Sequence, residues 1–462
     1  MSIVNRRPRL EIILLFIILI LLLIVLGVVC NRCCKTACGK TYDSAAIGSW
    51  NLLLPQPLGN DSLASTIATV EQQLLDSLGG QGYNVKLIHF NVYYCPCDKL
   101  LVSLSAVSLG ESGGSKVPTT GQPAQIPGAS GGSSWSVVNY NTPLAVPEIL
   151  DRQFFSIKNA DTTGLQIYSF VSKPTTKTIA IIDTGIDSLF GTNLTAYLVT
   201  KTPKGIYNFL PGANPQNNYD DDTYMHHGTL VTSVVARNYD PYNVNLQVLM
   251  LKALDSGGHG STFTVSCALS YAIQQKVDVI NLSLGYYGKK DSILQAYVQK
   301  ANDCHIPVVA AAGNTPGAHN QTLVRYELPV GHVGWIHYPN LQGSLTDTTS
   351  AGLFYPGSFC TTMPYVLSVT GFNKFNNAPC YYQNYSSVGY VSLGVVDTST
   401  CIYEWAGYGA EGSSFEAPVI AANILSTLPP TGTRAVKAAA IQYVTRTIMK
   451  SPHFVSQGYI SH

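Results

Sequence analysis

Three strongly apolar segments constrain the fold of this 462-residue chain more than any other feature. They span residues 178–182, 277–282 and 306–311. Strands of this composition are typical of a parallel sheet that is covered on both faces. Segments with helical spacing of apolar residues, such as 263–275, lie between them. The sequence therefore predicts a doubly wound α/β domain with a mainly parallel sheet flanked by helices.

Polar motifs follow these apolar segments closely. Asp183 follows the first segment, Ser283-Leu284-Gly285 follows the second, and Asn314 lies shortly after the third. The carboxyl ends of parallel strands meet at one edge of a sheet, and ligands bind beyond that edge in α/β folds. We therefore expect these residues to converge on one rim.

Ser414 lies in the motif Gly-Ser-Ser-Phe-Glu-Ala-Pro, directly before an apolar helical segment. We place Pro418 in the first helical turn, where a missing N–H is tolerated. The amides and positive dipole end of such a terminus favour negative charge on a serine oxygen. An ordinary N-cap at Ser413 or Ser414 is the alternative. Asn314 could donate its amide to an oxyanion, or simply end an Ala-Gly-Asn turn.

His227 begins the motif His-Gly-Thr and precedes another apolar helical segment. Histidine accepts a proton near neutral pH, as a general base must. His226 is the neighbouring alternative, but the Gly-Thr that follows favours His227. Asp183 would orient the imidazole and stabilise its cation, with Asp187 as the nearby competitor. Acid, base, amide and hydroxyl thus occur in one of the known chain orders of a Ser-His-Asp site.

Residues 176–450 resemble the subtilase (subtilisin-like) serine peptidases. The resemblance rests on the motifs Asp-Thr-Gly-Ile-Asp, His-Gly-Thr-Leu-Val, Val-Ile-Asn-Leu-Ser-Leu-Gly, Ala-Ala-Gly-Asn and Gly-Ser-Ser-Phe-Glu-Ala-Pro. It implies an endopeptidase that forms an acyl-enzyme on Ser414, with Asp183 and His227 completing the triad and Asn314 in the oxyanion hole. It also implies two edge segments that pair with an extended substrate backbone. These are Ser256, Gly257 and Gly258, and Ser283, Leu284 and Gly285.

Three features depart from the pattern of that family. Leu230 stands where many relatives carry a second histidine. Glu416 replaces a usually small residue, where it could complement the helix dipole or bias the accepted substrate charge. Residues 315–354 form a longer segment than usual after the Asn motif, which suggests a lid or a partner loop.

The N-terminal region contains an apolar run over residues 12–29, preceded by Arg6, Arg7 and Arg9. About 18 or more apolar residues are enough to cross a bilayer as a helix. We expect a single-pass membrane anchor with the N-terminus inside and the catalytic domain on the extracytoplasmic side. A cleaved signal peptide is the alternative.

The sequence divides into four parts. They are a head, anchor and Cys-rich segment (1–40), a small α+β unit resembling a pro-region (45–107), a Gly/Ser/Pro-rich linker (108–138), and a peptidase domain (139–455). Within the small unit we expect a helix over 63–78 and strands over 85–94 and 100–107. Cys95-Pro96-Cys97-Asp98 would form the turn between these strands, and its two cysteines are too close for a relaxed mutual disulfide.

Composition limits the partners. The net charge is +1 and charged residues make up 11%, which leaves no basic face for nucleic acid. Asp220-Asp221-Asp222 offers oxygen ligands for a structural calcium ion, but we prefer a solvated acidic turn. We assign no metal ligand and no cofactor, and expect a polypeptide substrate.

Two other classes remain as competing interpretations. Asp183-Thr184-Gly185 and Asp397-Thr398-Ser399 mimic the paired aspartates of an aspartic peptidase. That interpretation leaves His227, Asn314 and Ser414 without roles. The other is a catalytically inactive, membrane-anchored scaffold that keeps the fold to bind peptides, and the intact triad argues against it.

Overall fold

We analysed a computed structural model of the chain. It describes residues 43–110, 137–145, 175–187, 208–214, 220–223, 226–242, 244–314, 322–327, 333–338, 353–373, 378–379, 392–397, 403–405, 408–410, 412–429 and 459–461. The predicted anchor at 12–29 and most of the linker and of the 315–354 loop lie outside these ranges. Among the described helices, none combines the length and the apolar character that a membrane crossing requires.

Within the ranges given above, the central sheet has eight strands. They are β6 (Thr176–Asp183), β7 (Asn245–Lys252), β9 (Val279–Leu282), β11 (Val308–Ala311), β15 (Val366–Asn373), β16 (Ala378–Pro379), β17 (Ser392–Asp397) and β20 (Tyr459–Ser461). The order across the sheet is β20-β17-β15-β11-β9-β6-β7, and all of these neighbours run parallel. β16 alone adds antiparallel, beside β15. The predicted mainly parallel α/β sheet is confirmed.

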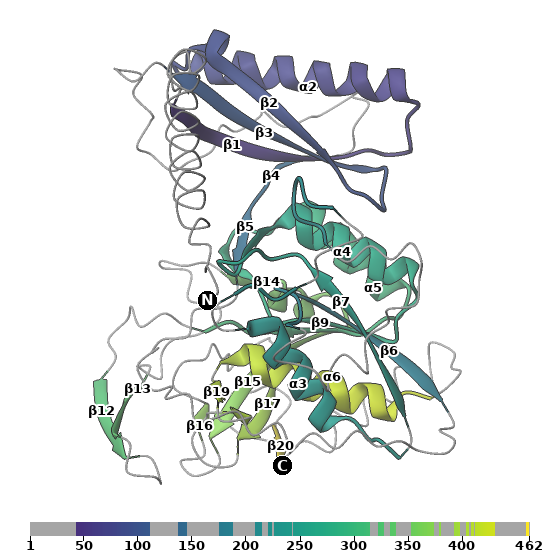
Figure 1. Cartoon of the computed structure of the whole chain (residues 1–462), viewed down its shortest axis with the longest axis vertical. Coiled ribbons are helices and arrows are strands. Elements are labelled where there is room, and N and C mark those ends of the chain that lie inside the picture. Colours follow the sequence, from purple (N-terminus) through teal and green to yellow (C-terminus); the bar gives the residue numbers. More distant parts are fainter. Residues whose placement is uncertain are drawn as a thin grey trace, which may run out of the picture. The chain divides into compact units, whose positions relative to one another are not determined.

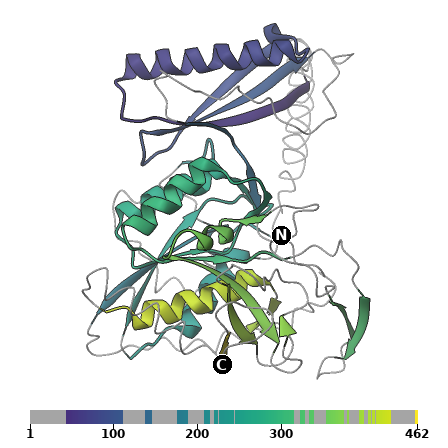
Figure 2. The same ribbon diagram turned by 180° about the vertical axis from the view of Figure 1, so that it is seen from behind.

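Four helices of the described part of the chain cover this sheet. They are α3 (His227–Asn238), α4 (Thr262–Gln274), α5 (Ser292–Asp303) and α6 (Ser413–Thr427). α4 and α5 lie on one face, and α3 and α6 lie on the other (Figures 1 and 2). Each pair packs into its own cluster of buried apolar side chains. This arrangement explains why the central strands are apolar throughout: both of their faces are buried.

Two of the predicted strands start later than their apolar runs. β9 and β11 begin two residues after Val277 and Ile306. Both residues instead close helix C-termini, following the left-handed residues Lys276 and His305. The amide of Val277 donates to the Ala272 carbonyl, and Ile306 makes the equivalent bond at the end of α5. This pattern is the Schellman motif, in which an apolar residue after the left-handed residue packs back onto the helix.

The helices differ in how they begin. α4 and α5 have local caps: Ser261 and Thr264 form a capping box, and the Asp291 side chain accepts two amide hydrogen bonds. α3 and α6 do not, because the residues before them, His226 and Gly412, make no side-chain cap bond. The first turns of α3 and α6 must therefore find acceptors elsewhere in the fold.

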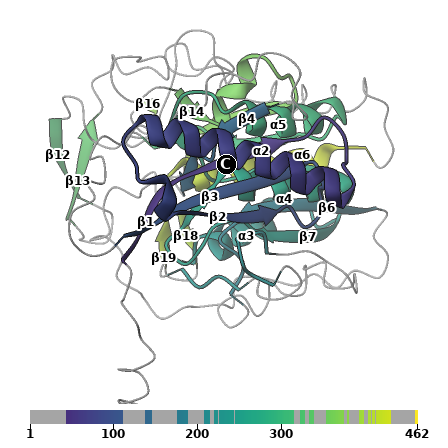
Figure 3. The ribbon, with the colours of Figure 1, turned by 90° about the horizontal axis from the view of Figure 1, so that it is seen from above.

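A second, smaller sheet precedes this domain. It consists of β1 (Asp43–Leu53), β2 (Ile88–Tyr94), β3 (Leu101–Gly110) and β4 (Val137–Tyr140), in the order β2-β3-β1-β4. The long helix α2 (Asn60–Gly80) runs along β2 and β3 (Figure 3). The predicted helix and two strands are thus present, with a 3-10 turn (Val85–Leu87) in place of the start of the first strand. β1 and β4 were not predicted.

Short elements complete the described chain. They are β5 (Pro143–Ala145), β8 (His259–Ser261), β10 (Tyr286–Gly288), β12 (Thr322–Glu327), β13 (Val333–Tyr338), β14 (Leu353–Tyr355), a 3-10 turn (Gly357–Thr361), β18 (Tyr403–Trp405) and β19 (Tyr408–Ala410). They form two-stranded pairs, β5 with β8, β10 with β14, β12 with β13 and β18 with β19.

Candidate active site

Asp183 and His227 are joined in the structure by a buried hydrogen bond. Asp183 ends β6 and is fully buried, and its Oδ1 lies 2.8 Å from Nδ1 of His227, the first residue of α3. The same oxygen accepts a bond of 2.7 Å from the Thr184 amide. This geometry can hold the ring with Nε2 facing away from the carboxylate, as a general base requires.

The two alternative candidates pair with each other instead. His226 Nδ1 lies 3.3 Å from Asp187 Oδ2, and 30% of the His226 side chain is exposed. His226 also adopts a left-handed backbone conformation, with φ of 48°. The fold therefore separates the neighbouring histidines into a buried pair with Asp183 and a more exposed pair with Asp187.

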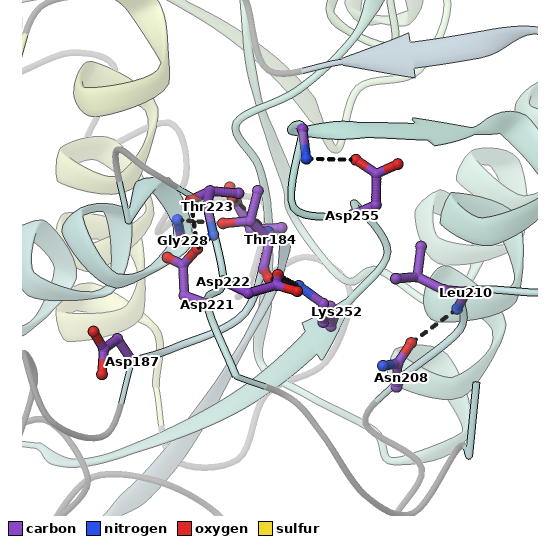
Figure 4. A network of polar contacts seen from close by, with 12 residues as sticks. Thr184, Asp187, Asn208, Leu210, Asp221, Asp222, Thr223, Gly228, Lys252 and Asp255 are labelled. Atoms are coloured by element: carbon purple, nitrogen blue, oxygen red, sulfur yellow. Dashed lines mark hydrogen bonds and ion pairs between the residues drawn. The ribbon is translucent and has the colours of Figure 1, made fainter. Parts of the chain in front are cut away.

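The first turn of α3 is capped by residues from two other segments (Figure 4). Thr184 accepts the Gly228 amide through its hydroxyl oxygen at 2.8 Å. Asp221 accepts both the amide and the hydroxyl of Thr229, each at 2.9 Å. Its second oxygen accepts the Thr223 hydroxyl at 2.6 Å. A buried carboxylate at a helix N-terminus also complements the helix dipole.

Lys252 lies next to this cap. It ends β7, is 1% exposed, and stands directly opposite Asp183 in the sheet register. Its ammonium donates to Asp222 at 2.7 Å and to the Thr184 carbonyl (Figure 4). Buried ammonium groups are costly unless paired, and these two acceptors supply the pairing.

The predicted solvated acidic turn at 220–222 is only partly present. Asp220 and Asp222 are exposed, but Asp221 is buried because it caps α3. Within the described ranges, no group of three His, Cys, Asp or Glu side chains is arranged to hold a metal ion. The possibility of structural calcium stays a prediction.

Ser414 lies in the first turn of α6 and is 2% exposed. Its hydroxyl donates to the Ser283 carbonyl at 3.2 Å, and the Ser283 hydroxyl donates to the Ser414 carbonyl at 2.7 Å. The second bond has a sequence cause. Pro418 lies beyond the predicted first turn and has no N–H, so it cannot donate to the carbonyl four residues earlier. Ser283 supplies the missing donor.

The structure does not join Ser414 to His227 by a hydrogen bond. Nε2 of His227 is buried and has no hydrogen-bond partner among the described residues. The ring packs against Phe415, with centroids 5.3 Å apart. The ring that carries this unpaired nitrogen therefore lies beside the first turn of α6.

Asn314 and Ser413 form the other half of the α6 cap. Asn314 Oδ1 accepts from the amide and the hydroxyl of Ser413, both at 3.0 Å. The Gly313 amide donates to the Ser413 hydroxyl at 3.1 Å. A side chain at Gly412 would approach Asn314 Nδ2 to 2.7 Å, so glycine is required for this contact. These bonds give Ser413 a structural partner and distinguish it from Ser414.

The two predicted substrate edges are a turn and a buried segment, and their role in binding substrate stays a prediction. Ser256, Gly257 and Gly258 form a turn held by Asp255, and the paired strand is β8, which starts after them. Ser283, Leu284 and Gly285 extend from β9 and are buried. Glycine at position 285 is needed because a Cβ there would overlap Phe354 and Tyr355 of β14. This reason differs from the one expected from the sequence, which was close approach of a substrate backbone.

Sequence reasoning missed the strand between these edges. β5 pairs antiparallel with β8, and Ala145 exchanges two backbone hydrogen bonds of 3.1 and 3.0 Å with Gly285. Leu144 is 1% exposed and belongs to the hydrophobic core. Three residues are too short for any periodic signal, so no pattern in the sequence could identify this strand.

Two of the departures from the family pattern have clear surroundings. Leu230 is buried in the core between α3 and α6, so an apolar residue suits the position. Glu416 is 7% exposed in the first turn of α6, where a carboxylate complements the helix dipole.

Comparison with known proteins identifies the family. The profile of the peptidase S8 subtilase family matches residues 175–428, more than half of the chain. The chain belongs to the subtilase family.

Individual relatives are distant. The chain is 27% identical over 292 residues to subtilisin of Bacillus pumilus, covering 61% of this chain and 88% of the relative. It is 35% identical over 105 residues to subtilisin DY of Bacillus licheniformis, covering 22% and 38%. It is 33% identical over 137 residues to the cell wall-associated protease of Bacillus subtilis (strain 168), covering 28% and 14%. The chain thus spans well under half the length of the latter two.

Proposed function

We propose that the protein is a serine endopeptidase that hydrolyses peptide bonds through an acyl-enzyme on Ser414. Its subtilase family membership supports serine peptidase activity. The observation that carries the proposal is the buried 2.8 Å bond between Asp183 and His227 beside the N-terminus of α6. A His–Asp pair of this kind is the proton-accepting part of a Ser-His-Asp site.

In the proposed mechanism the Ser414 hydroxyl attacks the carbonyl carbon of the substrate. Nε2 of His227 accepts the hydroxyl proton and later donates it to the leaving amine. Asp183 keeps the ring oriented and stabilises its cation. The Asn314 side-chain amide and the Ser414 backbone N–H would donate to the oxyanion. Water then hydrolyses the acyl-enzyme, with His227 again as the base.

We propose that the substrate binds as an extended strand between β8 and residues 283–285. The pairing of β5 in this position supports the idea, because Pro143–Ala145 uses the same backbone groups that a peptide would use. The segment then acts as an internal competitor for substrate.

Replacement of Ser414 by alanine tests the reaction. Ser414→Ala should abolish peptide hydrolysis and labelling by a serine-directed phosphonate. Ser413→Ala is the matched control, because it removes a neighbouring hydroxyl that is bonded to Asn314 and should leave labelling detectable. Labelling of Ser414→Ala at the wild-type level would rule out this nucleophile.

The competing classes give different results in the same assays. Inhibition by pepstatin but not by serine reagents would indicate an aspartic peptidase. Absence of turnover and labelling in the folded wild-type protein would favour a peptide-binding scaffold. We propose that no cofactor is needed, so activity should persist in EDTA.

We further propose that residues 12–29 anchor the protein in a membrane with the peptidase domain on the extracytoplasmic side. The apolar run and the preceding arginines support this. N-terminal sequencing of the mature, membrane-fractionated protein is the test. A mature chain that begins after residue 29 would show that the run is a removed signal peptide.

A further inference from the structure

The turn between β2 and β3 is bonded to α4 and α5. Asp98 Oδ2 accepts from the Ser270 hydroxyl of α4 at 2.9 Å and from the Tyr297 hydroxyl of α5 at 2.7 Å. Lys300 of α5 lies 3.9 Å from the same oxygen. Asp98 is buried, so these bonds hold the turn in one position.

Three thiols meet beneath this turn. Cys95 and Cys97 have their sulfur atoms 3.5 Å apart, and the Cys97 thiol lies 3.3 Å from the Cys267 carbonyl of α4. Cys95 and Cys267 belong to the same cluster of buried side chains. The three cysteines differ in solvent exposure: Cys97 is half-buried, Cys95 is 5% exposed and Cys267 is fully buried. Cys97 is therefore nearest the surface, and Cys267 lies in the core.

The three thiols differ in acidity. Burial disfavours a thiolate at Cys95, but hydrogen bonds from the Cys267 and Cys97 thiols outweigh it and lower the Cys95 pKa. The Cys97 pKa is raised by its bond to Cys95, and the Cys267 pKa is raised by burial. Cys95 therefore carries the thiolate, which is the reactive form, while Cys97 is the most exposed thiol of the three.

We propose that Cys95 and Cys267 form a thiol pair that a small-molecule disulfide converts into a covalent cross-link between the β2–β3 turn and α4. The bond would keep the N-terminal segment attached to the peptidase domain after any cut in the linker at 108–138. This proposal does not depend on peptidase activity, because it concerns only the thiols.

The reaction balances as three thiol–disulfide exchanges. The Cys97 thiol, the most exposed of the three, loses its proton as its sulfur attacks the small disulfide, which releases one small thiol and leaves a mixed disulfide. The Cys95 thiolate attacks the Cys97 sulfur and releases the second small thiolate. The Cys267 thiolate then attacks the Cys95 sulfur and releases Cys97. Overall, two protein thiols lose two electrons and two protons, and one small disulfide becomes two thiols.

The Cys95–Cys97 disulfide is only an intermediate in this scheme. With one residue between them, the two cysteines can form a bond only with distorted geometry, and strained disulfides are readily reduced. Exchange with Cys267 relieves that strain. The final bond joins residues far apart in the chain.

Peptide mapping of the oxidised protein tests the cross-link. Full-length Ser414→Ala protein, which avoids self-digestion, is incubated with oxidised glutathione, denatured, alkylated and digested with trypsin without reduction. Cys95 and Cys97 share the tryptic peptide 87–99, and Cys267 lies on 253–276. We expect mass spectrometry to detect these two peptides as one disulfide-linked species that reduction separates.

Single-cysteine variants assign the bond. Cys95→Ser and Cys267→Ser should abolish the linked species, whereas Cys97→Ser should retain it but form it several-fold more slowly. Recovery of all three cysteines alkylated in the oxidised wild-type protein would overturn the proposal, as would a stable bond confined to peptide 87–99. A linked species that survives Cys95→Ser would overturn the assignment of Cys95. The wild-type map decides the first question even if a variant does not fold.

Discussion

Three consecutive aspartates show how one residue type takes three roles. Asp220 is exposed, Asp221 caps α3 from a buried position, and Asp222 pairs with the buried ammonium of Lys252. The sequence offers no way to distinguish them, because they are identical, adjacent residues that share one sequence context. Their roles depend on which side chain faces the start of α3.

Asp221→Asn should reduce activity by disturbing the position of His227. Asparagine keeps the shape but removes the charge that accepts two bonds from Thr229. Hydrogen bonds to a charged group contribute about 1.5–3 kcal/mol each, so we expect a loss of about 2 kcal/mol in stability. We expect kcat to fall about tenfold with little change in KM, because the base is displaced while the substrate edges are intact.

Asp220→Asn is the matched control for this variant, since it makes the same chemical change at an exposed position. Its kcat and urea midpoint should equal those of the wild type. Equal kcat for Asp221→Asn and Asp220→Asn would show that the cap does not position His227.

At the scale of the element, the site helices α3 and α6 differ from α4 and α5. The latter two begin with their own capping side chains, so they are specified locally. α3 depends on Thr184 and Asp221, and α6 depends on Asn314. The candidate catalytic residues at these two N-termini are therefore positioned by long-range contacts.

Gly228→Ala should be strongly destabilising. The first turn of α3 packs so closely on the end of β6 that a Cβ at Gly228 would overlap the Gly185 carbonyl and lie 3.0 Å from the Gly185 amide. The overlapped atoms are backbone atoms that cannot move aside, so we expect a loss of at least about 3 kcal/mol. The urea midpoint and slope measure this change.

Gly59→Ala serves as its control. A Cβ at Gly59 would meet no atom within 4 Å, so the same substitution should change stability by less than about 1 kcal/mol. A wild-type urea midpoint for Gly228→Ala would contradict the close packing of α3 on β6.

At the scale of the whole molecule, β5 connects the N-terminal region to the proposed substrate site. Leu144 is the buried residue of this strand, while Pro143 is exposed. Leu144→Asp should weaken the pairing of the strand, since losing a buried leucine costs about 2 kcal/mol or more. If β5 competes with substrate, we expect the uncleaved protein to hydrolyse a short fluorogenic peptide about tenfold faster.

Pro143→Ser provides the comparison for Leu144→Asp, because it alters the same strand without removing a buried side chain. Its rate should stay at the wild-type value. An unchanged rate for Leu144→Asp would show that β5 does not compete with substrate.

Alkaline pH should destabilise the whole fold through buried tyrosines. Burial raises the pKa of Tyr286, with a further contribution from Asp291, and burial and Asp98 raise that of Tyr297. A pKa raised in the folded state means that stability is present below the unfolded value of about 10 and is lost above it. We expect the urea midpoint to fall steadily from pH 10 to 11.

Tyr286→Phe should reduce this alkaline slope by up to about 1.4 kcal/mol per pH unit, because one titrating group is removed. The wild-type protein provides the reference slope, and an identical slope for Tyr286→Phe would argue against a contribution of Tyr286.

Much of the fold was predictable because local sequence specifies it. The apolar strands β6, β9 and β11 and the helix α4 follow directly from hydrophobic pattern. The pattern placed two strand starts early because Val277 and Ile306 are apolar for a different reason, namely helix closure. β1, β4 and β5 were missed because pairing with distant strands, rather than composition, makes them strands.

The sequence by itself determined the parallel sheet and the candidates Asp183, His227 and Ser414, because strand ends and helix starts in such a sheet share one rim. The Gly-Thr that follows already favoured His227 over His226, and the tertiary structure set the partners of these neighbours. It paired Asp183 with His227 and Asp187 with His226, and it bonded Ser413 to Asn314. Adjacent residues point in different directions, so contacts between distant segments, rather than sequence context, set the partner of each one.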